Sequence, residues 1–223
     1  MMILGYWDIR GLGHAIRLLL EYTGTHYEEK RYVEGGGGCA GIGPDNDRSQ
    51  WLADKEKLGL DFPNLPYLLD GDVKLTQSNT ILRYIACKHG LCGDTETEKN
   101  FVSLLENEAL DLRMQIAYLS YDPEFEKRKG PYLEKLPSVL ARYSRFLGER
   151  HWFVGDKITL ADFVIYDGLD QHKILDPTCL QNFKNLQDFL VRFERLPAIA
   201  AYLKTSKCRR IPVNGKTAFW SNE

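Results

Sequence analysis

Two groups of polar side chains in this sequence have the types and spacing that suit a bound anion. Arg48 and Trp51 stand three residues apart and Lys55 follows a turn later, so a helix would place all three on one face. Two cations and an indole N–H can hold a carboxylate, although a solvated helix face has the same pattern. Gln77 and Ser78 stand just before a run with helical spacing, where the first N–H groups of a helix lack internal partners. Such a helix start favours a carboxylate or a phosphate.

Tyr6 is the candidate for catalytic chemistry. It stands near the end of a short apolar run, next to the glycine-containing turn at residues 10–13. Open α/β sheets bind their ligands at this end of a strand. A phenol hydroxyl can donate a hydrogen bond to an anion and so favour the charged form. Residue type alone also fits a tyrosine that only packs at the strand end.

The pattern around these residues predicts a strand, a helix and a strand, followed by a hairpin and a helix. The expected elements are a strand over 2–7, a helix over 12–22, a strand over 26–33, a hairpin over 64–75 and a helix from 78 to 89. A proline at the entry of the hairpin, Pro66, with a helix start facing it, resembles the second half of a thioredoxin-like domain. In that family the peptide bond before this proline is cis, which exposes the preceding backbone to an extended peptide.

The rest of the chain is expected to be helical. Residues 90–95 read as a linker, after which strand signals nearly vanish. The expected helices are one long helix over 101–116, one over 133–147 with Pro131 in its lead-in, one that begins after Thr159 with Asp162 in a capping box, and one over 183–203 interrupted at Pro197. We therefore predict a thioredoxin-like α/β domain over 1–89 and an all-α helical bundle domain over 96–223.

Composition and charge argue against several classes of protein. The 223 residues are 43% hydrophobic and 27% charged, which is ordinary for a globular protein. A net charge of -2 gives no reason to expect nucleic acid or a membrane surface as a partner. The first apolar run is broken at Asp8 and Arg10, too early for a secretory signal. Five scattered cysteines predict reduced thiols in a cytoplasmic protein: Cys39, Cys87, Cys92, Cys179 and Cys208.

The glycine tract at residues 35–43 satisfies G-x-G-x-x-G but does not predict a nucleotide site. A helix would have to begin there, and Ile42, Gly43 and Pro44 propagate one poorly. We expect a mobile surface loop, either an inert insertion or one that gates the binding site. The five histidines show no metal-ligand spacing.

Five longer motifs, taken in order, resemble a mu-class glutathione transferase. They are YWDIRG (6–11), DRSQWL (47–52), LGLDFPNLPY (58–67), LTQS (75–78) and YDPEFEK (121–127). Motifs that recur in order at compatible spacing are far more specific than a single short pattern. The resemblance covers nearly the whole chain and departs from the class at the 35–43 loop and in the C-terminal tail.

The resemblance implies conjugation of the glutathione thiolate to hydrophobic electrophiles, with Tyr6 holding the thiolate and with neither a metal nor a further cofactor. The residues implied in glutathione binding are Tyr6, Trp7, Leu12, Arg48, Trp51, Lys55, Asn64, Leu65, Pro66, Gln77, Ser78 and, from a second subunit, Asp111. The electrophile would contact Tyr6, Trp7, Leu12, Leu110, Arg113, Tyr121 and Asn214, in part through the helical domain. Arg113 and Asn214 depart from residues common in the class.

The resemblance also implies a homodimer. Phe62 lies in a proline-stiffened loop with little local core to join, which suits an aromatic that enters a pocket of a neighbouring subunit. Arg83 would lie close to the two-fold axis. Two alternatives stay open from the residues alone: a non-catalytic carrier of hydrophobic ligands, and a scaffold that uses the same fold for protein contacts.

Overall fold

The computed structural model describes residues 1–33 and 48–221, and the chain forms two compact units. Unit 1 contains Met1–Ile85 and Thr205–Glu223, and unit 2 contains Ala86–Lys204. Each unit has its own core and is described by itself. The glycine tract at 35–43, with its expected mobility, lies outside the described residues. Among the described residues, no helix combines the length and the apolar character that crossing a membrane requires.

Unit 1 is built on a four-stranded mixed sheet in the order β2-β1-β3-β4. Its strands are β1 (Met2–Trp7), β2 (Tyr27–Tyr32), β3 (Tyr67–Asp70) and β4 (Val73–Thr76). β1 runs parallel to β2 and antiparallel to β3, and β3 runs antiparallel to β4. This is the predicted strand–helix–strand unit followed by a hairpin, which confirms the thioredoxin-like class.

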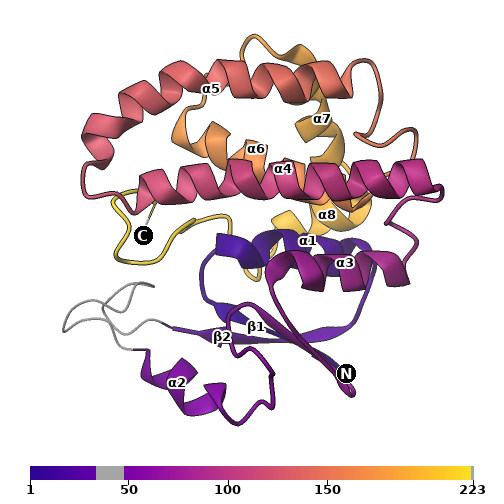
Figure 1. Ribbon diagram of the computed structural model, residues 1–223, viewed down its shortest axis with the longest axis vertical. Helices are drawn as coiled ribbons and strands as arrows, with labels where there is room; N and C mark the ends of the chain where they lie inside the picture. Colours follow the sequence, from indigo (N-terminus) through magenta and orange to yellow (C-terminus); the bar gives the residue numbers. More distant parts are fainter. Residues whose placement is uncertain (34–47, 222–223) are drawn as a thin grey trace. The chain divides into compact units, whose positions relative to one another are not determined.

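Among its described residues, unit 1 also contains one short 3-10 helix and three α-helices. They are η1 (Gly11–Gly13), α1 (His14–Tyr22), α2 (Ser49–Lys55) and α3 (Ser78–Lys88), the last of which passes into unit 2 at Ala86. In Figure 1, α1 and α3 lie above the sheet and α2 lies below it. Leu4 of β1, Ile16 of α1 and Leu68 of β3 are completely buried, so the core lies at the central strands.

The C-terminal tail belongs to unit 1, which differs from the expected helical domain over 96–223. The N–H groups of Arg10 and Gly11 donate to the carbonyls of Pro212 and Val213, over 2.9 and 3.0 Å. Arg209 donates to Asp8, which ties the same segment to the end of β1 over 2.8 Å. A pattern of neighbouring residues carries no signal for hydrogen bonds between the two ends of a chain.

Unit 2 is helical among its described residues. Its helices are α4 (Glu96–Ser120), α5 (Phe125–Leu147), α6 (Leu160–Leu175), α7 (Lys184–Glu194) and α8 (Pro197–Leu203). In Figure 1, α6 is drawn between α4 and α5 and behind them. α4 and α6 pack closely at Gly168, where an added Cβ would come 3.2 Å from Leu112.

α6 begins as predicted, with Thr159 before its first turn. The Asp162 carboxylate accepts hydrogen bonds from the Thr159 N–H over 2.8 Å and from the Phe153 N–H over 2.9 Å. Asp162 is completely buried, so these bonds satisfy a polar group inside the core. The capping box therefore forms although aspartate is shorter than the usual glutamate.

The helix predicted over 133–147 begins earlier, at Phe125, and contains both Pro131 and Pro137. Pro131 was expected in the lead-in, and it lies in the second turn instead. Phe125 in the first turn is 4% exposed, and the burial of its side chain offsets the hydrogen bond that the proline cannot donate.

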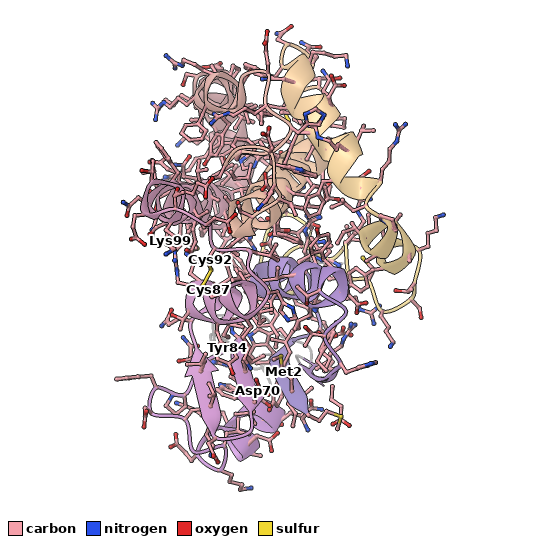
Figure 2. All side chains as sticks on the ribbon, turned by 90° about the vertical axis from the view of Figure 1, so that its right-hand side faces the viewer. Met2, Asp70, Tyr84, Cys87, Cys92 and Lys99 are labelled. Atoms are coloured by element: carbon pink, nitrogen blue, oxygen red, sulfur yellow. A yellow bond between two sulfur atoms is a disulfide. The ribbon has the colours of Figure 1, made fainter. Side chains whose placement is uncertain are left out.

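Cys87 and Cys92 form a disulfide, so the expectation that every cysteine is a reduced thiol is wrong for this pair (Figure 2). Gly90, at φ 70°, ends α3 and reverses the chain, which brings the two Cα atoms to 5.1 Å. Cα separations of this size suit a disulfide. Of the other cysteines in the described part of the chain, Cys179 and Cys208 form no disulfide.

Candidate active site

Tyr6 lies at the end of β1 and is 6% exposed. The N–H of Leu12 donates a hydrogen bond to the Tyr6 hydroxyl oxygen over 2.9 Å. The turn between them needs glycine, because a Cβ on Gly11 would come 2.7 Å from Cε1 of Tyr6. Gly11 also has φ +41°, where an L side chain is strained. The backbone thus fixes both the ring and the hydroxyl of Tyr6.

Arg17 of α1 holds the loop that follows Tyr6, and the sequence reasoning did not single it out. Its side chain is completely buried and donates to the carbonyls of Trp7 and Ile9 over 3.3 and 2.7 Å, and to Glu29. Its guanidinium carbon lies 5.8 Å from the centre of the Tyr6 ring. Spacing along the chain gave no signal for this role, because Arg17 falls outside the apolar positions Leu12, Ile16 and Leu19 of the helix.

Arg48 and Trp7 come together, as the expected carboxylate site requires. The Arg48 guanidinium carbon lies 5.8 Å from the centre of a Trp7 ring. Arg48 precedes α2, and among the described residues its buried Nε atom has no hydrogen-bond partner. Lys55 ends the same helix and is half-buried, 3.8 Å from Glu56.

Trp51 is 2% exposed and belongs to the hydrophobic cluster that contains Tyr32 of β2 and Tyr67 of β3. Its ring stacks on Tyr67 with centroids 6.1 Å apart and meets Tyr32 edge-on at 5.5 Å. The Tyr32 hydroxyl donates to Asp54 and lies 3.0 Å from the Tyr67 hydroxyl. Burial raises the pKa of both tyrosines, so both stay neutral. These two tyrosines position Trp51 and were missed, because spacing along the chain does not show which rings stack.

The hairpin entry has the predicted backbone. The peptide bond between Leu65 and Pro66 is cis, which confirms the expectation. The N–H of Leu65 donates to the side-chain oxygen of Asn64 over 2.9 Å, so this donor has a partner within the chain. Gln77 has φ 70° and stands directly before Ser78, where α3 begins.

The sequence-predicted residues of unit 1 largely converge. Tyr6, Trp7 and Trp51 belong to one hydrophobic cluster, with Leu12 and Leu65 packed against it. Asn214 is 2% exposed and its amide donates to the Trp220 carbonyl, so this side chain is engaged within the tail.

The predicted residues of unit 2 lie on α4 and at its end. Leu110, Asp111 and Arg113 belong to α4, and Tyr121 follows its last residue. Arg113 is buried and Asp111 is exposed. Phe62, the residue predicted at the dimer interface, belongs to unit 1 and is 79% exposed.

No cluster of three or more potential metal ligands occurs in the described ranges 1–33 and 48–221.

Comparison with known proteins places both parts of the chain in one family. The glutathione S-transferase N-terminal domain family matches residues 2–87, and the C-terminal domain family matches residues 110–206. Among solved structures, the glutathione S-transferase Blo t 8 superposes with a TM-score of 0.87 at 33% identity, over 98% of this chain and 99% of that one. The Onchocerca volvulus pi-class enzyme gives 0.84 at 31% identity, over 97% and 99%.

Curated relatives resolve the class. Glutathione S-transferase Mu 4 of Mus musculus is 61% identical over 222 residues, which cover 100% of this chain and 99% of that protein. Glutathione S-transferase Mu 1 of Homo sapiens is 60% identical with the same coverage. These full-length matches support conjugation of glutathione rather than a carrier or a scaffold. This chain belongs to the mu class of the glutathione S-transferases.

Proposed function

We propose that this enzyme joins glutathione to hydrophobic electrophilic small molecules and that Tyr6 stabilises the glutathione thiolate. The observation that carries the proposal is the hydrogen bond from the Leu12 N–H to the Tyr6 oxygen. Accepting this bond polarises the hydroxyl and makes it a stronger donor to a sulfur anion. Lowering a thiol pKa from about 8.5 by about two units requires roughly 2.7 kcal/mol of preferential stabilisation.

The remaining glutathione contacts follow from the three groups around Tyr6. Arg48, Lys55 and the Trp7 and Trp51 rings would hold the glycyl carboxylate. The Nε of Arg48, which has no hydrogen-bond partner among residues 1–33 and 48–221, suits an anion. Leu65 would pair with the cysteinyl backbone beside the cis Pro66, in exchange for the Asn64 bond. The γ-glutamyl end would bind at the start of α3, with Gln77, Ser78 and Asp111 of a second subunit.

The matched variants Tyr6→Phe and Tyr27→Phe test the role of Tyr6. Tyr6→Phe should keep its affinity for glutathione, lose turnover by about tenfold to a thousandfold, and raise the pKa of the bound thiol towards its free value. Tyr27→Phe removes a hydroxyl that bonds to Glu21 instead, and it should leave the thiol pKa unchanged. Ultraviolet titration of the bound thiol and steady-state rates measure both. An unaltered thiol pKa in Tyr6→Phe would refute the assignment.

A two-fold homodimer in the cytoplasm is part of the proposal. Phe62 is 79% exposed, which is costly for an isolated aromatic ring in water. Unit 2 carries a pocket of about 240 Å³ between α4 and α5, lined by Leu104, Leu105, Glu108, Arg142, Tyr143 and Phe146. Phe101 and Leu104 near it are 42% and 48% exposed. An apolar pocket and an exposed aromatic on the same chain suit a reciprocal, two-fold contact.

A further inference from the structure

The Cys87–Cys92 disulfide closes a turn that is hydrogen-bonded independently of the sulfur atoms. The N–H of Leu91 donates to the Ala86 carbonyl over 2.9 Å, and the N–H of Gly90 donates to the Cys87 carbonyl over 3.3 Å. Gly90, at φ 70°, supplies the left-handed residue that ends a helix in this way. The backbone therefore keeps the two cysteines close whether the sulfur–sulfur bond is formed or broken.

The two cysteine residues differ in their exposure to solvent. Cys87 belongs to the last turn of α3 and is exposed, whereas Cys92 is 9% exposed. Lys88 and His89, which follow Cys87, are exposed as well. On the other side of the turn, Asp94 is paired with Lys157, and Glu98 accepts the Asp94 and Thr95 N–H groups. The exposed side of the turn thus carries Cys87, whereas the carboxylates that follow Cys92 already have hydrogen-bond and ion-pair partners.

We propose that Cys87 and Cys92 form a reversible thiol–disulfide site for glutathione, with Cys87 as the residue modified and Cys92 as the resolving thiol. Attack requires a reachable sulfur, and exposure assigns that role to Cys87. The site uses none of the residues around Tyr6 and does not rest on the conjugation reaction. Protein disulfides in a reducing compartment are mostly of this transient kind.

The exchange runs in two balanced steps. A glutathione thiolate attacks Cys87 Sγ, a glutathione–Cys87 disulfide forms, and the Cys87–Cys92 bond breaks with its electron pair on Cys92 Sγ, which takes up a proton. A second glutathione thiolate attacks the glutathione sulfur of this mixed disulfide and releases glutathione disulfide and the Cys87 thiol. Two cysteines gain two electrons, and two glutathione molecules lose them. Glutathione disulfide drives the same steps in reverse.

The test uses the full-length chain equilibrated with glutathione and glutathione disulfide at several ratios, quenched with acid and mapped by mass spectrometry. The parent should pass between the Cys87–Cys92 disulfide and two thiols as the ratio changes, with little mixed disulfide. Cys92→Ser removes the resolving thiol, so a glutathione adduct on Cys87 should rise at least tenfold. Cys87→Ser should carry little adduct, because Cys92 is buried.

Two controls separate this site from the rest of the enzyme. Cys208→Ser should behave as the parent, and Tyr6→Phe should exchange at the parent rate because the catalytic tyrosine takes no part. Melting temperatures of the cysteine variants verify that each one folds. The proposal is overturned if Cys92 in Cys87→Ser is modified as fast as Cys87 in Cys92→Ser, or if no glutathione ratio interconverts the two forms in the parent.

Discussion

Backbone atoms contact the Tyr6 side chain on two sides, and these contacts limit which residues can replace its neighbours in the turn. Leu12 donates to the oxygen, while Gly11 and Gly13 lie against the ring. A methyl group at either glycine would have to displace the ring. Since a misplacement of about 1 Å can cost a large part of the rate, these glycines matter for catalysis although they carry no reactive group.

Gly11→Ala should therefore damage catalysis more than stability. The positive φ of Gly11 costs alanine roughly 1–2 kcal/mol, and the new methyl group also pushes on Tyr6. Gly24→Ala is the matched control, because Gly24 has φ +64° with nothing within 4 Å of an added Cβ. Both variants should lose free energy of unfolding in urea, Gly11→Ala more than Gly24→Ala because its methyl group meets the Tyr6 ring, and only Gly11→Ala should lose turnover with an electrophile. Equal turnover in the two variants would contradict this reading of the contact.

Residue types and spacing made Tyr6, Arg48 and Trp51 candidates, and the resemblance to the mu class favoured them over residues that only pack or face solvent. Residue types and spacing were not enough for Arg17 or for the paired hydroxyls of Tyr32 and Tyr67, which act on residues distant in sequence. The difference is physical. A helix start or a turn is fixed by neighbours along the chain, whereas a buried guanidinium group finds its acceptors only when the sheet has formed.

Polar groups inside α6 give this helix a pH dependence of its own. His172 is completely buried, with Nδ1 2.7 Å from the Gly168 carbonyl and Nε2 2.6 Å from the Tyr132 hydroxyl. Burial lowers the pKa of His172 to about 4, and the charge of Arg113 acts in the same direction. Because the ring stays neutral in the folded state and protonates readily when unfolded, the lowered pKa favours folding at neutral pH.

The contribution of His172 should be fully present above pH 6.5 and should fall away as the pH drops from 6.5 towards 4. At the lower limit the loss amounts to about 3 kcal/mol. Urea unfolding of the parent and of His172→Gln at pH 7.5 and 4.5 measures it, and the variant should show the smaller loss. Burial raises the pKa of Asp162 to about 7, so Asp162 stabilises the fold as the pH falls, opposite to His172. Both proteins contain Asp162, so the difference between the parent and His172→Gln isolates the effect of His172. Exposed His26→Gln should match the parent.

Among the elements, β1 to β4 and the start of α6 were predictable because strong local signals agree with the packing. The start of α5 was not. Apolar spacing placed it after Pro131, and the buried ring of Phe125 extends it six residues further back than the proline itself. Burial of Phe125 outweighed the helix-breaking tendency of Pro131, and apolar spacing along the chain does not reveal such burial.

Assembly of two subunits should depend on Phe62. Loss of a central aromatic anchor costs about 2 kcal/mol, roughly thirtyfold in the dimer dissociation constant. Sedimentation of Phe62→Ala should therefore show dissociation at concentrations where the parent stays paired. Affinity for glutathione should fall as well, because Asp111 would come from the partner subunit.

Phe219→Ala is the control for this test, since Phe219 is also exposed, at 55%, but lies in the tail. It should dissociate like the parent. A parent chain that sediments as an active monomer at micromolar concentration would refute the dimer itself.

The division into two units shows where prediction from sequence stopped. A change from strand to helix signals near residue 90 predicted a division of the chain, and the two compact units divide between Ile85 and Ala86. The sequence did not predict that the tail belongs to unit 1 or that Cys87 and Cys92 are bonded. Each depends on which segments the folded chain brings together. Composition predicted reduced cysteines, but the turn at Gly90 brings Cys87 and Cys92 close enough to form a disulfide.

The hydrogen bonds from Arg10 and Gly11 to the tail have a consequence for the synthesis of the enzyme. Asp8 and Arg209, which fasten the same contact, are 201 residues apart. A ribosome makes the chain from its N-terminus, so the sheet strands and their helices emerge long before Pro212 and Val213 exist. During that interval the turn beside Tyr6 lacks two of its backbone acceptors. The nascent chain can therefore form its thioredoxin-like sheet early, while the turn beside Tyr6 gains its hydrogen bonds to the tail last.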